Sequence, residues 1–286
     1  MAERIQKILA TMGMGSRRQL EAMIEEGRIR INGEVAKLGD RAEYSDRIHV
    51  DGRVVKLHYR PKEKHRVLAY NKPEGEICSR SDPEGRPTIF DNLPKLRSGR
   101  WVAVGRLDIN TSGLILLTTD GELANKLMHP SSEIEREYAV RIMGEVDKSV
   151  LKLLRKGVEL EDGPAKFNEV RDAGGQGFNH WYHVTLSEGR KREVRRLWES
   201  QGFTVSRLIR LRYGEIKLDR SVRTGTWSEL GRAELDYLYE SVGLSAAPEA
   251  EEKPKGHQRG AKSASSARKK NTRRDQPRAG ARRPRR

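Results

Sequence analysis

The sequence is poor in cysteine and aromatic residues and has no long apolar run. Its one cysteine, Cys78, excludes an internal disulfide and any metal site that needs several thiolates. No apolar stretch approaches the roughly 20 residues of a membrane-spanning helix. The first residues, Met1-Ala2-Glu3-Arg4, lack the apolar core of a signal peptide. We therefore expect a cytoplasmic protein that does not contact a membrane.

Glycine-rich phosphate loops and clusters of metal ligands are also missing. No Gly-x-x-x-x-Gly-Lys segment occurs, and no Gly-x-Gly-x-x-Gly segment follows an expected strand. The seven histidines are scattered, and His180 and His183 have no cysteine or carboxylate at ligand spacing. These absences argue against a metal-dependent or nucleotide-dependent enzyme, so we expect no metal and no cofactor.

Positive charge, by contrast, is abundant. Lys and Arg number 57 against 41 Asp and Glu, which gives the 286 residues a net charge of +16. An excess of this sign and size favours a polyanionic partner, with nucleic acid ahead of an acidic membrane surface.

The end of the chain, residues 245–286, differs in composition from the rest. It holds 14 Lys and Arg, 4 Asp and Glu, and no Leu, Ile, Val or aromatic residue. Such a segment cannot bury enough apolar surface to offset the entropy lost on ordering. We predict a disordered basic tail that binds RNA phosphates. The alternative is a passive solubilising tail.

The first 60 residues show the pattern of a small module of two helices and two hairpins. Apolar residues recur at helical spacing from Ile5 to Met12, and Ser16 with Gln19 marks the start of a second helix that ends at Gly27. Hairpin turns are expected at Asn32-Gly33 and Asp51-Gly52.

Basic residues gather on the second helix and the first hairpin of this module. The segments Gly15-Ser16-Arg17-Arg18 and Gly27-Arg28-Ile29-Arg30-Ile31-Asn32-Gly33 resemble the S4 RNA-binding module, which presents a basic helical face to structured RNA. The resemblance implies that Arg17, Arg18, Arg28 and Arg30 bind RNA. The alternative is an ordinary α+β cap with a solvated charged face.

Between residues 66 and 244 short strands dominate. Strands are expected at 66–70, 114–117, 137–143, 166–171, 181–186, 205–211 and 214–218, helices at 122–128, 149–156 and 191–200, and a glycine-rich loop at 173–178. Strands and helices do not alternate regularly, which favours an α+β fold with a mainly antiparallel mixed sheet. We predict four parts: the module at 1–60, a linker at 61–65, a second domain at 66–244 and the tail at 245–286.

One carboxylate in this second domain has an unusual setting. Asp108 lies in the segment Gly105-Arg106-Leu107-Asp108, just ahead of Gly113 and an apolar strand. Loops between rigid strands are usual places for catalytic groups, although an aspartate there can also simply cap a turn. Tyr138, early in a later strand, and the arginine-dense segment 189–196 add an aromatic and cations. An enzyme that flips a base out of its stack needs these groups.

Three segments together resemble the active-site motifs of a known enzyme family. They are Gly105-Arg-Leu-Asp108 with Gly113-Leu114, Arg136-Glu-Tyr138, and Gly189-Arg-Lys-Arg-Glu-Val-Arg-Arg196. The family is that of the pseudouridine synthases that join an S4 module to a catalytic domain and modify bacterial ribosomal RNA. The likeness spans residues 3–244, and the segments 66–75, 82–88, 119–125 and 205–210 resemble members that act on the large subunit.

The resemblance implies a role for each matching residue. Asp108 corresponds to the catalytic aspartate, which acts on a uridine as nucleophile toward the sugar or as base at C2′. Arg195 corresponds to an arginine that pairs with this carboxylate, and Tyr138 to the aromatic that packs on the flipped base. Arg106 is expected to fill the gap left by the base or to bind a phosphate, and Arg192 and Arg196 to contact RNA.

The family further implies that the chain acts on large-subunit ribosomal RNA, and we expect a monomer that works on an assembling particle. Two alternatives remain open at this point: a non-catalytic RNA-binding factor for ribosome assembly, and a synthase for small-subunit ribosomal RNA. A nuclease or glycosylase is disfavoured because the sequence lacks the metal cluster or acid–base pair of such enzymes.

Overall fold

The structure, a computed structural model, describes residues 2–57, 65–176 and 178–245. Apart from His65 and Ser245, the predicted linker at 61–65 and the predicted tail at 245–286 lie outside the described residues. None of the helices in the described ranges has the length and apolar character needed to cross a membrane.

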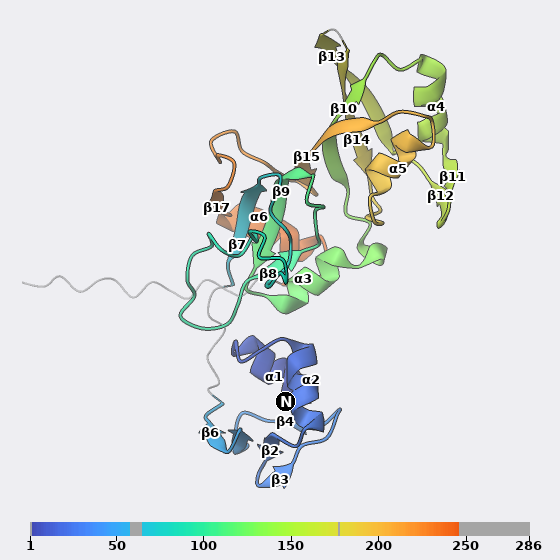
Figure 1. The fold of residues 1–286 in the computed structure, drawn as a ribbon. Helices are drawn as coiled ribbons and strands as arrows, with labels where there is room; N and C mark the ends of the chain where they lie inside the picture. The colour runs from blue at the N-terminus through green and yellow to red at the C-terminus, as the bar shows by residue number, and fades with distance from the viewer. Residues whose placement is uncertain (1, 58–64, 177, 246–286) are drawn as a thin grey trace, which may run out of the picture. The chain divides into compact units, whose positions relative to one another are not determined.

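The N-terminal region has the predicted helices and hairpins (Figure 1). Its elements are β1 (Glu3–Arg4), α1 (Ile5–Thr11), α2 (Arg17–Glu25), β2 (Ile29–Ile31), β3 (Glu34–Val35), β4 (Arg41–Ala42), β5 (Ile48–Val50) and β6 (Arg53–Val55). Four strands pair in the order β3-β2-β5-β6, and β1 pairs with β4. Both helices and the sheet share one core, which includes Ile5, Leu9, Leu20, Ile29 and Ile48.

Local sequence explains where these elements begin and end. The Ser16 side chain accepts from the backbone N–H of Gln19, and the Gln19 side chain accepts from the N–H of Ser16. This capping box confirms the predicted start of α2. Asn32 and Gly33 both have positive φ, at 52° and 97°, as a two-residue hairpin turn with the twist of its strands requires.

The region after residue 65 is built on one large sheet. Its strands are β7 (Val67–Lys72), β8 (Val102–Val104), β9 (Ser112–Thr118), β10 (Arg136–Met143), β13 (Glu169–Gln176), β14 (Asn179–Leu186), β15 (Val205–Tyr213), β16 (Ile216–Lys217) and β17 (Trp227–Glu229). The order is β13-β14-β10-β15-β9-β7-β17, with β16 on β15 and β8 on β9. Among the described strands only β15 and β9 pair in parallel, which confirms the predicted α+β fold with a mainly antiparallel sheet.

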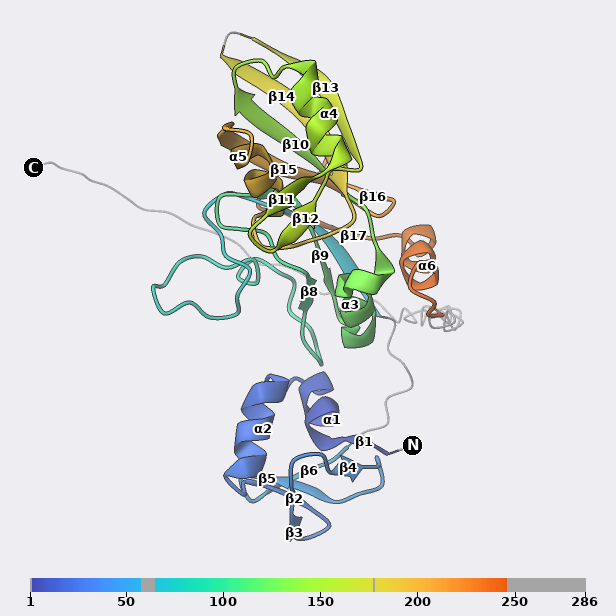
Figure 2. The same cartoon turned by 90° about the vertical axis from the view of Figure 1, so that its right-hand side faces the viewer.

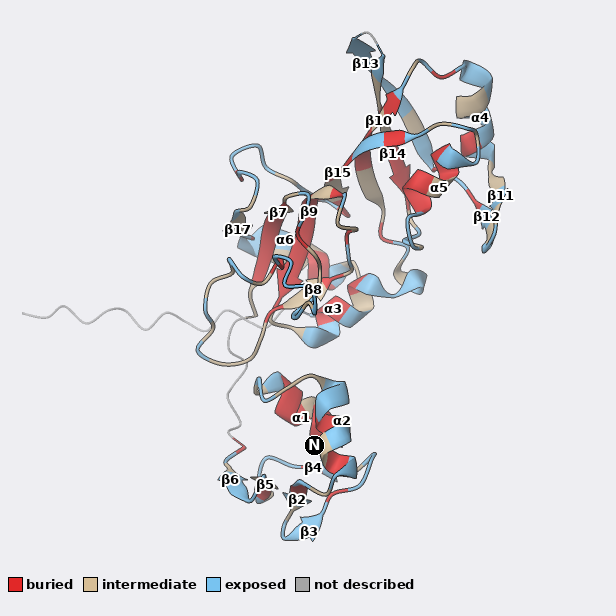
Figure 3. Ribbon diagram, viewed as in Figure 1, coloured by how far each residue is buried: buried red, intermediate tan, exposed pale blue. Residues whose placement is uncertain are grey.

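Helices and a small hairpin flank this sheet (Figure 2). They are α3 (Gly121–Met128), the 3-10 helix η1 (Pro130–Ser132), α4 (Lys148–Lys156), β11 (Val158–Leu160), β12 (Gly163–Ala165), α5 (Glu193–Glu199) and α6 (Arg232–Glu240). One core contains Tyr70, Tyr138 and Val140 of the sheet with Leu154 of α4 and Trp198 of α5. A second core, with Leu116 and residues of α3 and α6, lies on the other face of β7 and β9. These two strands are accordingly buried over almost their whole length (Figure 3).

Two expectations for this region were wrong in detail. The predicted loop at 173–178 is largely strand, because β13 continues to Gln176 through a bulge between Asp172 and Gly175. A Cβ on Gly175 would lie 2.2 Å from the carbonyl oxygen of Asn179, so glycine there permits the hairpin to close. Helix α5 starts at Glu193, two residues later than expected, because Arg192 is left-handed with φ of 53°.

The pairing of β9 with β15 depends on a glycine. Gly113 lies opposite Arg210 in the parallel register and has φ of +99°. A Cβ at Gly113 would meet the Arg210 carbonyl oxygen at 2.3 Å and the Arg210 nitrogen at 2.8 Å. Since both contacts are with backbone, no side-chain rotation can relieve them. Gly113 therefore permits the close approach that joins the two halves of the sheet.

We predict that Gly113→Ala lowers the free energy of unfolding by roughly 3 kcal/mol or more, because strain from positive φ adds to the overlap with backbone. Gly144→Ala is the matched control, since Gly144 has φ of +86° with open space around it. Its expected cost is about 1 kcal/mol. Urea unfolding of both variants measures the difference, and equal losses would contradict the role of the close contact.

Candidate active site

Asp108 lies in a turn that leads into β9. Its carbonyl oxygen accepts from the backbone N–H of Thr111 at 3.0 Å, and the side chain is partly buried. Gly113, Arg210 and Tyr138 form one row across β9, β15 and β10, because Gly113 pairs with Arg210 and Arg210 with Tyr138. The sheet thus places Tyr138 two strands away from the strand that begins just after Asp108.

Each backbone carbonyl from Leu107 to Thr111 accepts a hydrogen bond. Leu107 accepts from the Cys78 thiol at 3.3 Å, Ile109 from the backbone N–H of Gly75 at 2.9 Å, and Asn110 from Arg195 at 2.8 Å. Lys72 donates to Thr111 at 2.8 Å and more weakly to Ile109 at 3.5 Å. Backbone whose carbonyls are all bound has little freedom to rearrange, so this turn, which we call the Asp108 turn (residues 107–111), is held from several sides.

Lys72 is the most deeply placed of the groups that hold the Asp108 turn. Its side chain is 0% exposed, and its ammonium also donates to the carbonyl of the adjacent Pro73 at 2.9 Å. Burial lowers the pKa of Lys72 below its ordinary value, while the carboxylates of Glu76, Glu74 and Asp108 act in the opposite direction. The carbonyl oxygens and these acidic neighbours offset the cost of burying the charge.

Arg195 approaches the Asp108 turn from α5. Its guanidinium donates to the carbonyls of Val205 and Asn110, both at 2.8 Å, and the residue is 8% exposed. Burial lowers its pKa and so does the charge of Arg192, whereas Asp108 raises it. The expected direct pair with the carboxylate is not among the hydrogen bonds and ion pairs of the described residues. Arg195 is instead tied to the residue two positions after Asp108.

The Asp108 carboxylate itself has no hydrogen bond or ion pair with any residue in the described ranges. Its neighbours hold the backbone around it and leave its oxygens available. Two buried cations, Lys72 and Arg195, lie close enough to interact with its charge. A carboxylate that is oriented by its backbone, near positive charge and free of partners, can act as a nucleophile or a base.

Tyr138 and Cys78 complete the surroundings of the turn. Tyr138 is 9% exposed and shares a core with Leu107, the residue before Asp108. Burial raises the pKa of the Cys78 thiol, which keeps its proton on sulfur so that it can donate to Leu107. The same sulfur accepts from the Leu107 N–H at 3.3 Å. Across the described ranges, no three His, Cys, Asp or Glu residues are placed to hold a metal ion.

Of the arginines expected to contact RNA in this region, some are already engaged in ion pairs. Arg196 forms a two-pronged pair with Asp162 at 2.7 and 2.8 Å, and Arg192 pairs with Glu199 at 2.9 Å. Arg106, next to Asp108 in sequence, is exposed. Arg106 is therefore better placed for RNA than Arg196, whose cation is largely neutralised by its partner. The RNA roles of all three stay predictions.

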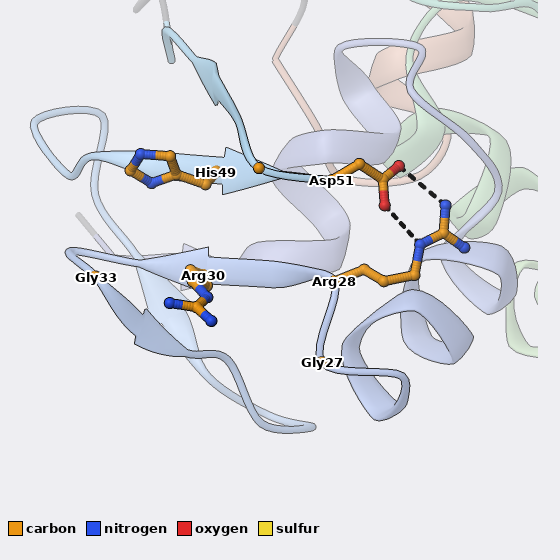
Figure 4. Close-up of a pocket in the computed structure, with 7 residues that line it drawn as sticks. Gly27, Arg28, Arg30, Gly33, His49 and Asp51 are labelled. Carbon is orange, nitrogen blue, oxygen red and sulfur yellow. Dashed lines mark hydrogen bonds and ion pairs between the residues drawn. The ribbon is translucent and has the colours of Figure 1, made fainter.

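The N-terminal arginines divide in the same way. Arg28 donates to both oxygens of Asp51, at 2.6 and 2.9 Å, and to Glu26 at 2.9 Å. Arg30 is exposed and lines a pocket of about 470 Å³ together with His49 and the glycines of both hairpin turns (Figure 4). Arg17 and Arg18 are exposed at the start of α2.

Comparison with known proteins places the chain in a family. A model of the RNA pseudouridylate synthases matches residues 66–200, and a model of the S4 domain matches residues 3–48. "Ribosomal large subunit pseudouridine synthase B" of Pasteurella multocida (strain Pm70) is 60% identical over 85% of this chain and 71% of its own length. The chain belongs to the RNA pseudouridylate synthase family. It has the S4 domain and the synthase domain that the sequence predicted.

Further relatives of this pseudouridine synthase agree. The protein of the same name from Escherichia coli (strain K12) is 58% identical over 85% of this chain and 84% of its own length. A solved structure described as "Crystal structure of pseudouridylate synthase" is 28% identical, with a TM-score of 0.58, and covers 82% of this chain and 99% of the solved chain.

The sequence prediction missed Lys72 as part of the site. It placed Lys72 only at the end of the first strand of the synthase domain, although the strand β7 in fact runs through it. A lysine that follows a buried apolar strand and precedes a proline was the available signal, since such a position is unusual for a solvated charge. This pattern does not show which backbone carbonyls accept hydrogen bonds from the Lys72 ammonium.

We predict that Lys72→Met lowers kcat at least tenfold, because the carbonyls of Thr111 and Ile109 lose their donor and the Asp108 turn shifts. RNA affinity should change by less than about twofold. Lys126→Met is the control, because Lys126 donates to only one carbonyl, that of Val242 at 3.3 Å, in another part of the fold. Single-turnover rates measure the effect, and a folded Lys72→Met protein with unchanged kcat would contradict it.

Proposed function

We propose that this enzyme converts a uridine of large-subunit ribosomal RNA into pseudouridine, with Asp108 as the catalytic carboxylate. The substrate is inferred from relatives of 58–60% identity that carry this activity in their names. The observation that supports the catalytic role is the unpartnered Asp108 carboxylate on a turn whose carbonyls are all bound. Asp108 as a simple turn cap would use its side-chain oxygens, which make no hydrogen bond to the described residues.

The reaction is an isomerisation and needs no co-reactant. The N1–C1′ bond of the uridine breaks, the uracil turns, C1′ bonds to C5, and the proton lost from C5 is balanced by one gained at N1. Asp108 would attack C1′ as a nucleophile or remove the C2′ proton as a base, and either role requires the ionised carboxylate.

Tyr138 would pack against the uracil after it leaves the RNA stack. Its ring borders the same core as Leu107, so the base would lie between the aromatic ring and the Asp108 turn. Arg195 would act on Asp108 through the backbone of Asn110, as a positioning residue.

The S4 domain would supply most of the RNA affinity outside the catalytic cleft. Its candidate phosphate contacts are the exposed Arg17, Arg18, Arg28 and Arg30, of which Arg28 is already paired with Asp51 and Glu26. We further propose that the enzyme works in the cytoplasm as a monomer on an assembling ribosomal particle, where the target nucleotide is still accessible.

We predict that Asp108→Asn abolishes pseudouridine formation and leaves RNA affinity within about twofold, because the amide keeps the shape and loses the charge. Carbodiimide labelling and primer extension on large-subunit ribosomal RNA measure the modification. The RNA would come from cells with the protein, without it, and with the variant. Asp147→Asn is the control, since Asp147 caps α4 and asparagine caps a helix equally well.

A modified nucleotide appears as a stop in primer extension. A stop that is absent from cells without the protein and from cells with Asp108→Asn, but present with Asp147→Asn, identifies the target nucleotide and shows that Asp108 is required. A stop on small-subunit RNA instead would assign the enzyme to that subunit. No dependent stop on either RNA would contradict the enzymatic proposal and favour an assembly factor. If the Asp108→Asn protein does not fold, Asp108 is needed for the structure and its catalytic role is not supported.

Deletion of residues 245–286 should weaken RNA binding and flatten its salt dependence. The truncated protein lacks the tail's 14 basic residues, so its binding displaces fewer counterions from the RNA. Affinity for ribosomal RNA fragments between about 50 and 200 mM salt measures the slope. An unchanged slope would show that the tail does not contact the RNA.

A further inference from the structure

The outer half of the large sheet consists of β10, β13, β14 and β15, and the hydrophobic cores cover only one of its two faces. Helices α4 and α5 pack on the face of β10 and β14 that carries Tyr138 and Val140. Side chains alternate along a strand, so Arg141 and Met143 of β10 lie on the opposite face. Neither residue belongs to a hydrophobic cluster of the described chain, and Met143 is 59% exposed.

Three side chains form a row across this face. In the strand register Arg141 of β10 lies opposite Trp181 of β14 on one side and opposite Arg207 of β15 on the other. Neighbouring strands are about 4.8 Å apart, so the row spans roughly 10 Å. We call Trp181, Arg141 and Arg207 the sheet-face row. It places an aromatic ring and two guanidinium groups in a line.

Arg141 is held in one orientation but is not neutralised. Its Nε donates to the Ser206 hydroxyl at 3.0 Å, and that hydroxyl donates back to the Arg141 carbonyl at 3.0 Å. Its guanidinium lies 5.8 Å from the centre of the Trp181 ring. Within the described part of the chain Arg141 has no ion pair, and both Nη groups lack a partner.

A nearby arginine shows how different this arrangement is. Arg212, farther along β15, pairs with Glu135 at 2.6 Å and with Glu137 at 3.1 Å, so its charge is used within the fold. Arg141 has only a neutral hydroxyl at Nε. A fixed guanidinium whose two Nη groups are free matches the two oxygens of a phosphate.

The other end of the row approaches the candidate active site. Arg207 is 50% exposed and lies 3.8 Å from Glu74, a weak contact between two half-exposed groups. Glu74 directly precedes Gly75, whose backbone N–H donates to the Ile109 carbonyl of the Asp108 turn at 2.9 Å. The sheet-face row therefore runs from the outer strand β14 to the segment that holds the Asp108 turn, on the face of the sheet opposite Tyr138.

We propose that the sheet-face row binds the RNA strand that flanks the target uridine. Arg141 and Arg207 contact its phosphates, and an unpaired base stacks on the Trp181–Arg141 pair, with Met143 alongside. The proposal relies on the proposed function for the identity of the RNA. The sheet-face row would contact the phosphates and base faces of the RNA, so its contribution can be measured as binding without any turnover.

The test uses the full chain and a labelled hairpin of large-subunit ribosomal RNA with single-stranded flanks. Arg141→Ala and Arg207→Ala should each weaken binding roughly tenfold and reduce the salt slope by about one counterion. Arg141→Lys should recover only part of the affinity, because a point charge replaces the fork. The control is Arg155→Ala, which removes an exposed arginine from α4 on the other side of the sheet. It should change affinity by less than twofold.

Turnover gives a second, independent readout. Where the hairpin is a substrate, Arg141→Ala should raise KM and leave kcat at saturating RNA unchanged, since Arg141 does not touch the Asp108 turn. Thermal melting checks that each variant is folded. If Arg141→Ala binds RNA as well as Arg155→Ala does, RNA is not the partner of this face and the proposal fails. Loss of kcat without loss of affinity would overturn it as well.

Failure of the proposed function would look different. In that case the wild-type protein would isomerise no uridine of the hairpin, while the affinity difference between Arg141→Ala and Arg155→Ala could still be measured. A tenfold difference with no turnover would support the sheet-face row and reject the large-subunit substrate.

Discussion

The backbone contact between Gly113 and Arg210 is the constraint on which the synthase domain depends. It joins β7 and β9 to the outer strands β10, β13 and β14 through one short parallel pairing. Only glycine permits the approach, because a Cβ would overlap the Arg210 backbone. Asp108 comes just before this joint in the chain, and Tyr138 lies across from it. The strand pairing therefore sets where Tyr138 lies relative to the strand that follows Asp108, and side-chain hydrogen bonds then hold the Asp108 turn.

Near this joint, the positively charged side chains of the site act on Asp108 without binding its carboxylate. Lys72 and Arg195 do not bind the carboxylate of Asp108; they bind the carbonyls of the residues that follow it. Both cations are buried, and burial lowers the pKa of each, so their charge acts in a region of reduced dielectric. The arrangement gives Asp108 a positive surrounding and a fixed backbone without occupying its oxygens. A carboxylate in a direct salt bridge would have to break that bridge before it could react.

Arginines in this chain differ in what their charge does, although the sequence makes them look alike. Arg28, Arg196 and Arg212 are paired with carboxylates and hold the fold together. Arg30 and Arg141 have no such pair among the described residues, and their guanidinium groups face outward from hairpin or sheet. Net charge predicted a polyanionic partner, but only the three-dimensional pairing separates structural arginines from those available for RNA.

Local signals in the sequence were sufficient for much of the fold. The Ser16 capping box and the Asn32-Gly33 turn involve residues within a few positions of one another, and the structure has both as expected. Several elements were missed, among them β8, the β11–β12 hairpin, β17 and α6. Residues 173–176 of the expected loop are strand, because their pairing with β14 decides the conformation and glycine content does not.

By itself the sequence determined the α+β class through local patterns. Its resemblance to a known family, carried by contiguous motifs, gave the S4 and synthase domains and the candidate site residues Asp108, Tyr138 and Arg195. Only the tertiary structure decided that Lys72 is part of the site, that Arg195 binds the carbonyl of Asn110, and that Arg141 lies between Trp181 and Arg207. Each of those facts joins residues far apart in the chain. Their contacts depend on strand order and register, which no local pattern of residues specifies.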